Sequence, residues 1–497
     1  MEEESPISKD ADISAELLNE APKKKISKKK IIIISVIISI AFIILLTTIT
    51  IVVIKRKKGN GDEKENEDED DDGNNNTVIA EINCIYNIYS TEENIQLLSN
   101  QFNPKTKLEL NINGKDLGFI KQYKFDQKGD IPVKIKVYEN LDMDNMFKEV
   151  NNLLQVEMVS FTNSTTNCQI TSMKNTFEGC EDLFNFTMIN FDTKNLKSMH
   201  KLFYRSGINE YNFINVSTSN LEDISYMFAS TNIEIFELKG LTFSSVKNMS
   251  HLFEECSTLI SVNTKGFVTS NVEDMSYMFN SVTSMYNLDL NDFVTSKCIY
   301  MNNMFQSCNS LYLLSIDNFD TRNVKDMSYM FDSCYSLESI NTVKFRTPNL
   351  IKMDSMFRLC TSLSQLDLSE FNTQNVISTQ KLFLNCQSLN LLNLSNFDFS
   401  NNKDMSEMFS GCEGLTEIIF SDNINTQNVI DMSGLFDDCS SLTNITNLDK
   451  FNTANVIDMS NMFKDCRVMK ELNLNNFNTE KVLNMSRMFQ TYIALSS

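Results

Sequence analysis

The sequence predicts an α/β solenoid with one short strand and one short helix in each repeat of about 26 residues, preceded by a small β-domain and a single transmembrane helix. Three observations lead to this prediction. A Phe closes a segment patterned on NVxDMSxMF fourteen times, most often at intervals of 26 residues. An apolar stretch without charge, Gly or Pro runs from Ile31 to Ile54. Between the two, residues 77–140 alternate apolar and polar side chains, as short strands do.

The apolar stretch from Ile31 to Ile54 is long enough to cross a membrane. Its 24 residues would form a helix of about 36 Å, against about 30 Å for the hydrocarbon core of a bilayer. A cleaved signal peptide fits poorly, because the stretch is too long and begins far from the N-terminus. We therefore expect a single-pass protein that contacts the membrane through residues 31–54.

Basic residues flank this stretch on both sides. Six Lys lie in the 20 residues before it, and four Lys and one Arg lie in the 20 residues after it. The small excess favours a cytoplasmic N-terminus at the plasma membrane, with residues 1–30 as a short disordered tail and the repeats outside the cell. Residues 55–76 are rich in Asp and Glu and nearly free of apolar side chains, which is typical of a solvated linker.

The segment 77–140 is expected to be a small β-rich domain. The runs KLELNING, FIKQYKF and IPVKIKVYEN alternate apolar and polar residues and are separated by turn signals. Such a domain could cap the open end of a solenoid over residues 141–497.

The repeat itself supplies the helix prediction. Met327, Met330, Phe331 and Cys334 are spaced i, i+3, i+4 and i+7, which is one face of a helix. Asp326 precedes this face and could cap the helix through its side-chain oxygen. After the Cys, the pattern SLxxLxL alternates as a strand does. Stacked repeats would then form a parallel sheet on one side and a row of helices on the other.

The full pattern, FxTxNVxDMSxMFxxCxSLxxLxL, resembles the leucine-rich repeats of BspA-like surface proteins over about residues 141–497. The copies around Phe203 and Phe228 depart from it, since Ser206 and Thr231 replace the Cys. The resemblance implies a curved leucine-rich-repeat solenoid displayed outside the cell and associated with adhesion or surface interaction.

Nine of the twelve cysteines lie three residues after a repeat Phe. Neighbouring repeats are about 4.8 Å apart in such a stack, so disulfides between them are geometrically conceivable. A Cys that recurs on an apolar face also behaves as a small buried hydrophobic residue, and we favour reduced thiols. We expect no zinc site, since Cys-x-x-Cys pairs are absent and the chain has only two His.

The sequence argues against an enzyme and against a nucleic-acid-binding protein. His200 and His251 lie within repeats and are expected to face solvent, and no phosphate-binding loop is present. We therefore predict no catalytic residue, no cofactor and no metal. The net charge of −21 is unsuited to neutralising phosphates.

Two functional classes remain: a surface protein that binds an unidentified protein or glycan, and a structural coat or scaffold without a dedicated ligand. Exposed aromatic residues on the sheet face would favour the first class, and a uniformly polar face the second. We expect binding along the strands and the turns beside them, on a strip from about Asp289 to Asn473. The candidate binding residues are Asp289, Tyr312, Ser315, Asn341, Asp367, Asn393, Thr446 and Asn473.

Overall fold

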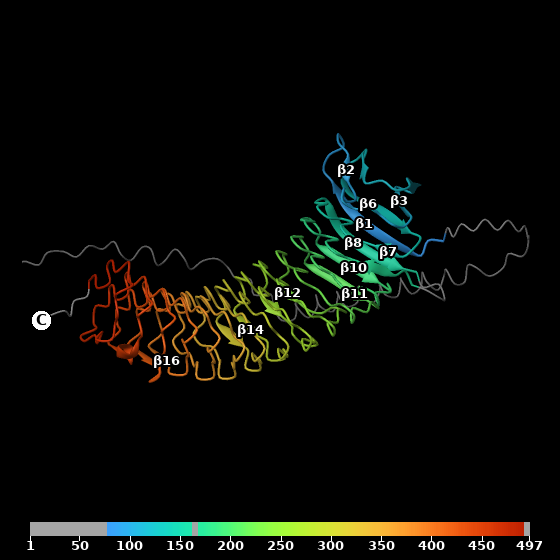
Figure 1. Cartoon of the computed structure of the whole chain (residues 1–497). Coiled ribbons are helices and arrows are strands. Elements are labelled where there is room, and N and C mark those ends of the chain that lie inside the picture. The colour runs from blue at the N-terminus through green and yellow to red at the C-terminus, as the bar shows by residue number, and fades with distance from the viewer. Residues whose placement is uncertain (1–76, 162–166, 492–497) are drawn as a thin grey trace, which may run out of the picture. The chain divides into compact units, whose positions relative to one another are not determined.

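The computed structural model describes residues 77–161 and 167–491, which belong to one compact unit, Asn75–Ser497 (Figure 1). The predicted tail, transmembrane helix and acidic linker lie outside the described residues. Within the described ranges, no helix is long and apolar enough to cross a membrane. The described residues form a β-solenoid, and we call one turn of it a rung and name the rung after its repeat Phe.

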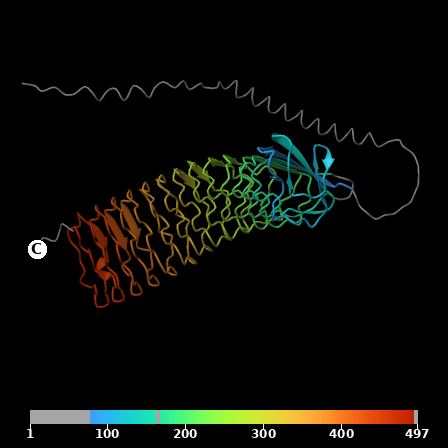
Figure 2. The same ribbon diagram turned by 90° about the horizontal axis from the view of Figure 1, so that it is seen from above.

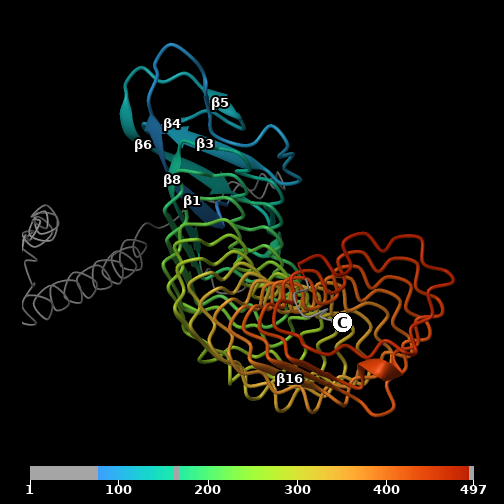
Figure 3. The same cartoon turned by 90° about the vertical axis from the view of Figure 1, so that its left-hand side faces the viewer.

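The strands of the N-terminal part and the first rungs are β1 (Ala80–Ile88), β2 (Ile95–Gln96), β3 (Leu108–Ile112), β4 (Lys115–Asp116), β5 (Gln122–Tyr123), β6 (Gly129–Val137), β7 (Leu141–Asp142), β8 (Leu153–Ser160), β9 (Ile170–Ser172), β10 (Asn185–Ile189) and β11 (Glu210–Ile214). The later rungs contribute β12 (Ile235–Phe236), β13 (Ser261–Val262), β14 (Asn287–Asp289), β15 (Leu313–Ser315), β16 (Leu391–Leu394), β17 (Glu417–Phe420), β18 (Asn444–Thr446) and the 3-10 helix η1 (Leu448–Lys450). Figures 2 and 3 show the rungs following one another from the N-terminal strands to the last rung.

The N-terminal strands and the first rungs share one sheet, in the order β11-β10-β8-β1-β6-β3-β4. The solenoid strands β8, β10 and β11 are parallel to one another, whereas β1 pairs antiparallel with both β8 and β6. Along β1, buried residues alternate with more exposed ones, which agrees with the alternation in its sequence. Because β1 occupies the edge of β8, the backbone groups of the first solenoid strand are already paired.

The prediction of one helix per repeat is wrong: the segment after Asp326 is a series of turns, and η1 is the one helical element among the described residues. Tyr329 and Ser333 adopt left-handed backbone angles, with φ of 59° and 61°. The N–H of Phe331 donates to the carbonyl of Met356 in the next rung at 2.9 Å, and the N–H of Cys334 donates to the Phe331 carbonyl at 3.1 Å. Alternate amides therefore bond between rungs, and those in between close local turns.

The turns produce the same spacing as a helix. Two left-handed residues, four positions apart in the repeat, redirect the chain, so apolar side chains point inward three and four residues apart. Met327, Met330, Phe331 and Cys334 are all fully buried, as expected. The carboxylate of Asp326 accepts the N–H of Ser328 at 3.0 Å, so it caps a turn instead of a helix.

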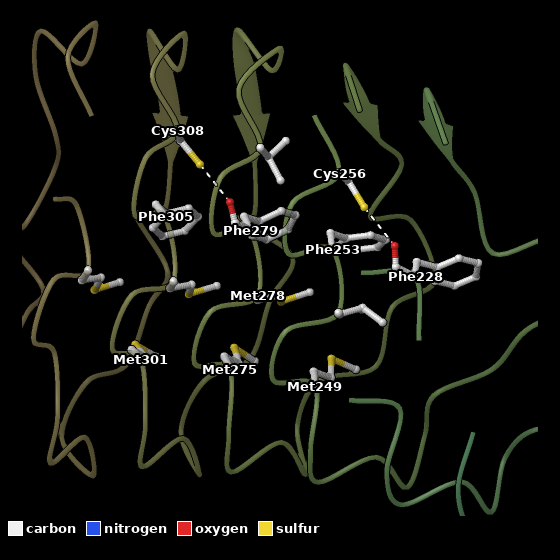
Figure 4. Close-up of a cluster of buried hydrophobic side chains, with 14 of the residues drawn as sticks. Phe228, Met249, Phe253, Cys256, Met275, Met278, Phe279, Met301, Phe305 and Cys308 are labelled. Atoms are coloured by element: carbon white, nitrogen blue, oxygen red, sulfur yellow. Dashed lines mark hydrogen bonds between the residues drawn. The ribbon is translucent and has the colours of Figure 1, made fainter. Parts of the chain in front are cut away.

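The repeat Phe residues form a continuous stack inside the solenoid. The ring of Phe357 lies 5.5 Å from that of Phe331 and 5.7 Å from that of Phe383, with the planes 13° and 5° apart. Figure 4 shows the same arrangement for Phe228, Phe253, Phe279 and Phe305. The ring of Phe357 is therefore enclosed on both faces by its neighbours in the stack.

The cysteines of the repeats are buried and bonded to the backbone. All twelve cysteines are free thiols, and all twelve are buried. Each of the nine repeat thiols donates to the carbonyl of the Phe in the preceding rung, with Sγ to oxygen distances of 2.9 to 3.1 Å. Figure 4 shows two of these bonds, from Cys256 to Phe228 and from Cys308 to Phe279. Burial raises the pKa of Cys308 to about 12, so the thiol stays neutral and can donate.

The NTxNV segment links neighbouring rungs through its side chains. The hydroxyl of Thr373 donates to the carbonyl of Asp398 at 3.0 Å and accepts the N–H of the same residue at 2.7 Å. The amide of Asn375 donates to the carbonyl of Pro348 in the preceding rung at 2.9 Å. Equivalent Thr and Asn bonds recur along the solenoid, which explains why the repeat keeps these two residue types.

Candidate interaction surface

The strand side of the solenoid presents two exposed columns of side chains, one residue per rung. The outer column contains Glu234, Ile260, Tyr286, Tyr312, Glu338, Ser364, Asn390, Thr416 and Thr443. Backbone bonds hold its members in line, for example from the N–H of Tyr312 to the carbonyl of Tyr286 at 2.9 Å. The inner column contains Ile235, Ser261, Asn287, Leu313, Ser339, Gln365, Leu391, Glu417 and Asn444, and its strand pairs include Asn287 with Leu313 and Leu391 with Glu417.

Apolar and aromatic residues gather in these columns over a few neighbouring rungs. We define the tyrosine patch as Ile235, Ile260, Tyr286, Tyr312 and Leu313. Four of them are 52 to 54% exposed, and Tyr312 is half-buried. The rings of Tyr286 and Tyr312 stack with centroids 5.1 Å apart and planes 10° apart. The Tyr312 hydroxyl donates to Glu338 at 2.8 Å, and this bond holds the pKa of the tyrosine above its usual value.

The fold does not require apolar residues at these positions. In the rungs that follow the patch, the outer column carries Glu338, Ser364, Asn390 and Thr416, with the same backbone bonds between rungs. Since polar residues serve equally well there, the apolar side chains of the patch have no packing role that explains them. Contiguous exposed apolar residues of this kind mark interaction sites.

Carboxylates border the tyrosine patch. In the outer column, Glu234 precedes the patch residues and Glu338 follows them. Glu237 lies two residues after Ile235, and Asp289 lies two residues after Asn287. All four are exposed. Over the same stretch neither column carries a Lys or an Arg, and none of the ion pairs among the described residues involves these four carboxylates.

The candidate residues named from the sequence fall into two groups. Tyr312 belongs to the tyrosine patch, Asp289 is the last residue of β14, and Ser315 is the last residue of β15. The other five lie in or beside later rungs and outside the patch: Asn341, Asp367, Asn393, Thr446 and Asn473. Sequence reasoning did not include Ile235, Ile260, Tyr286 or Leu313 among the binding residues. These four residues could have been identified from the sequence, because each is apolar or aromatic at a repeat position that is polar in most other copies.

Most of the polar candidates have a role in their own turns. Five of these candidate residues accept a hydrogen bond through a side-chain oxygen, from the backbone N–H two residues further on, at 2.9 to 3.2 Å. They are Asp289, Asn341, Asp367, Asn393 and Asn473. This hydrogen bond closes the turn that follows the strand. The recurrence of Asp and Asn at this position is thus explained by turn formation.

The two histidines are half-buried, so the expectation that they face solvent is wrong. The His251 ring lies between those of Tyr226 and Tyr277, at 4.0 and 4.5 Å, and its Nδ1 is 2.8 Å from Glu254. The Nδ1 of His200 is 2.7 Å from the hydroxyl of Ser225. Among the residues that the structure describes, no group of three or more His, Cys, Asp or Glu is placed to hold a metal ion.

The repeats match a known family model in overlapping copies. The model is described as "Mycoplasma protein of unknown function, DUF285", and it matches residues 141–258, 229–339, 311–421 and 405–496. The chain belongs to the DUF285 family. No curated protein matches this DUF285 chain.

Three solved structures resemble parts of this DUF285 protein. A leucine-rich-repeat protein from Eubacterium ventriosum has 15% identity and a TM-score of 0.32, covering 69% of this chain and 91% of its own. A leucine-rich cell-surface protein from Faecalibacterium prausnitzii has 17% identity and a TM-score of 0.31, covering 63% and 83%. A leucine-rich-repeat protein of Leptospira interrogans has 12% identity and a TM-score of 0.22, covering 58% and 86%.

Proposed function

We propose that this DUF285 protein is a surface-displayed binding protein of the BspA-like leucine-rich-repeat kind, and that its partner contacts the tyrosine patch. The observation that carries the proposal is the exposure of Ile235, Ile260, Tyr286 and Leu313 at positions where most other rungs have polar residues. Tyr is enriched among residues that dominate binding energy, because it buries a large area at low conformational cost. The protein would act by binding and not by catalysis.

The proposal includes the arrangement at the membrane. Residues 31–54 would form a single transmembrane helix with the N-terminus in the cytoplasm, and the acidic linker 55–76 would hold the repeats away from the lipid surface. The partner would be either a protein or a glycan. A structural coat protein is the second candidate, favoured by the polar outer column from Glu338 to Thr443.

The membrane arrangement is tested by adding protease to intact cells. We expect loss of the repeats and survival of a fragment that contains the N-terminal tail. An antibody to residues 1–30 should detect that fragment, whereas permeabilised cells should lose it as well. Repeats that resist protease until the cells are permeabilised would refute display at the surface.

The binding proposal is tested by capturing partners with the full-length protein from a protein array and a glycan array. Tyr286→Ser combined with Ile260→Ser should remove the captured signal. Leu391→Ser is the matched control, because Leu391 is 48% exposed and occupies the same column as Leu313, three rungs later. Capture that survives in the double variant would show that the partner binds outside the tyrosine patch and would refute this site. Capture of nothing by the unaltered protein would favour the coat protein.

A further inference from the structure

We propose that the tyrosine patch binds a cationic polypeptide segment, whose apolar side chains cover Ile260 and Tyr286 and whose Lys or Arg side chains pair with the carboxylates around them. This inference rests on the proposed binding function and narrows it to one class of partner.

The charge of the patch is the first argument. Its border carries Glu234, Glu237, Asp289 and Glu338, which have no cationic partner among the described residues. Glu222, a half-buried carboxylate elsewhere on the same solenoid, shows the contrast: it pairs with Lys197 at 2.7 Å and with Lys247 at 3.0 Å. Four carboxylates without a cationic partner around an apolar centre attract a partner of opposite charge and repel an acidic one.

The shape of the aromatic pair is the second argument. The rings of Tyr286 and Tyr312 stack on each other, so each ring covers one face of its neighbour. Stacking therefore leaves one face and the edges of each ring for a partner. The edges and the neighbouring Ile260 and Leu313 offer lateral apolar contact, which suits aliphatic side chains, and a Lys or Arg can pack against the outer face of a ring.

The layout of the patch suits a polypeptide chain. Its five residues come from four successive rungs, which are about 4.8 Å apart in such a stack, and carboxylates stand at both ends of the outer column. An apolar centre with a charged rim is the usual anatomy of a protein interface. Cationic residues on both sides of an apolar pair would therefore reach Glu234 at one end and Glu338 at the other.

The test measures the binding of a short fluorescein-labelled peptide of alternating Lys and Leu to full-length protein in detergent, by fluorescence anisotropy. We expect the triple variant Glu234→Gln, Asp289→Asn, Glu338→Gln to bind about ten-fold more weakly and with a smaller dependence on salt. Asn can keep the turn hydrogen bond that Asp289 accepts, so this variant removes charge without opening the turn. Tyr286→Ser with Ile260→Ser should weaken binding by a similar factor, and Leu391→Ser should not.

Two matched peptides identify the partner class. A peptide of alternating Glu and Leu should not bind, and one of alternating Lys and Ser should bind much more weakly. The acidic linker attracts any cationic peptide, so binding is counted only where the patch variants reduce it. Unchanged affinity in the triple variant, or patch-dependent binding of a neutral oligosaccharide in place of the peptide, would overturn the inference.

The outcome separates this inference from the proposed function. If a captured partner depends on Tyr286 and Ile260 but is unaffected by the charge variant, the binding function stands and the cationic partner is wrong. If the captured partner is insensitive to Tyr286 and Ile260, the patch is not the binding surface and both proposals fail. Circular dichroism and resistance to protease of each variant establish that it has folded.

Discussion

The bond between Thr373 and Asp398 should be a main support of the solenoid at that rung, and Thr373→Val tests it. Val has nearly the shape of Thr and can fill the same fully enclosed site, but it neither donates nor accepts a hydrogen bond. The substitution leaves the N–H and the carbonyl of Asp398 without the partners that they have at 2.7 and 3.0 Å. Each backbone group left unsatisfied costs about 1–3 kcal/mol.

The two costs together give about 2–6 kcal/mol. The side chain of Asp398 is exposed, so water reaches part of this site, and we expect the lower part of that range, about 2–3 kcal/mol. Thr373→Ser is the matched control, because it keeps the hydroxyl and loses one methyl group, at about 1 kcal/mol. The difference between the two variants therefore measures the hydrogen bonds.

Amide hydrogen exchange of peptides from the rungs on either side of Thr373 is the appropriate assay. Because each rung contacts only its neighbours, Thr373→Val should raise exchange in the Phe383 and Phe409 rungs and leave the N-terminal sheet unchanged. Equal exchange in Thr373→Val and Thr373→Ser would refute the role given to the hydroxyl. A uniform increase along the whole chain would refute the independence of the rungs.

Three further predictions concern the core, the thiols and the turns. Phe357→Ala should destabilise its rung by about 3–5 kcal/mol, since the ring is fully buried and stacked on both sides. Amide hydrogen exchange should rise near that rung first, and loss of protection along the whole chain at once would contradict this. Cys386 should resist a thiol-reactive dye at pH 8 until the protein is unfolded. Burial holds the pKa of this thiol well above its usual value, so the reactive thiolate is not formed. Fast labelling of the folded protein would contradict this prediction. Asp367→Ala should cost about 1 kcal/mol through loss of the turn bond from Ser369, whereas Asp367→Asn should cost less, as read from urea denaturation. The same bond lowers the pKa of Asp367, so its contribution should be present above the unfolded pKa and lost as pH falls through the folded value.

The sequence was sufficient to identify a solenoid and its interior. The regular interval between the repeat Phe residues requires that each repeat pack on its neighbours, and the residues at fixed offsets from each Phe are buried in the structure, as Met327 and Cys334 illustrate. The alternation in residues 77–140 also corresponds to observed strands, including β1, β3 and β6. These features depend on hydrophobic periodicity, which is a local property of the chain.

The secondary structure of the repeat could not be decided in the same way. A spacing of three and four residues is compatible with a helix and with turns that use two left-handed residues four positions apart, as at Tyr329 and Ser333. What distinguishes the two is where the amides bond. In this fold the N–H of Phe331 reaches the next rung, and that partner is far away in the sequence.

The candidate site shows the same division between local and long-range information. The sequence placed Tyr312 on the exposed side of a strand, but it assigned binding to Asp367 and Asn393, whose oxygens close their own turns. Only the stacking of rungs brings Tyr286 and Tyr312 together, since they are separated by a whole repeat along the chain. The period and the buried positions of this protein follow from its sequence, whereas the turns and the tyrosine patch follow from contacts between rungs, because hydrogen bonds and exposed columns form across a stack that no single repeat contains.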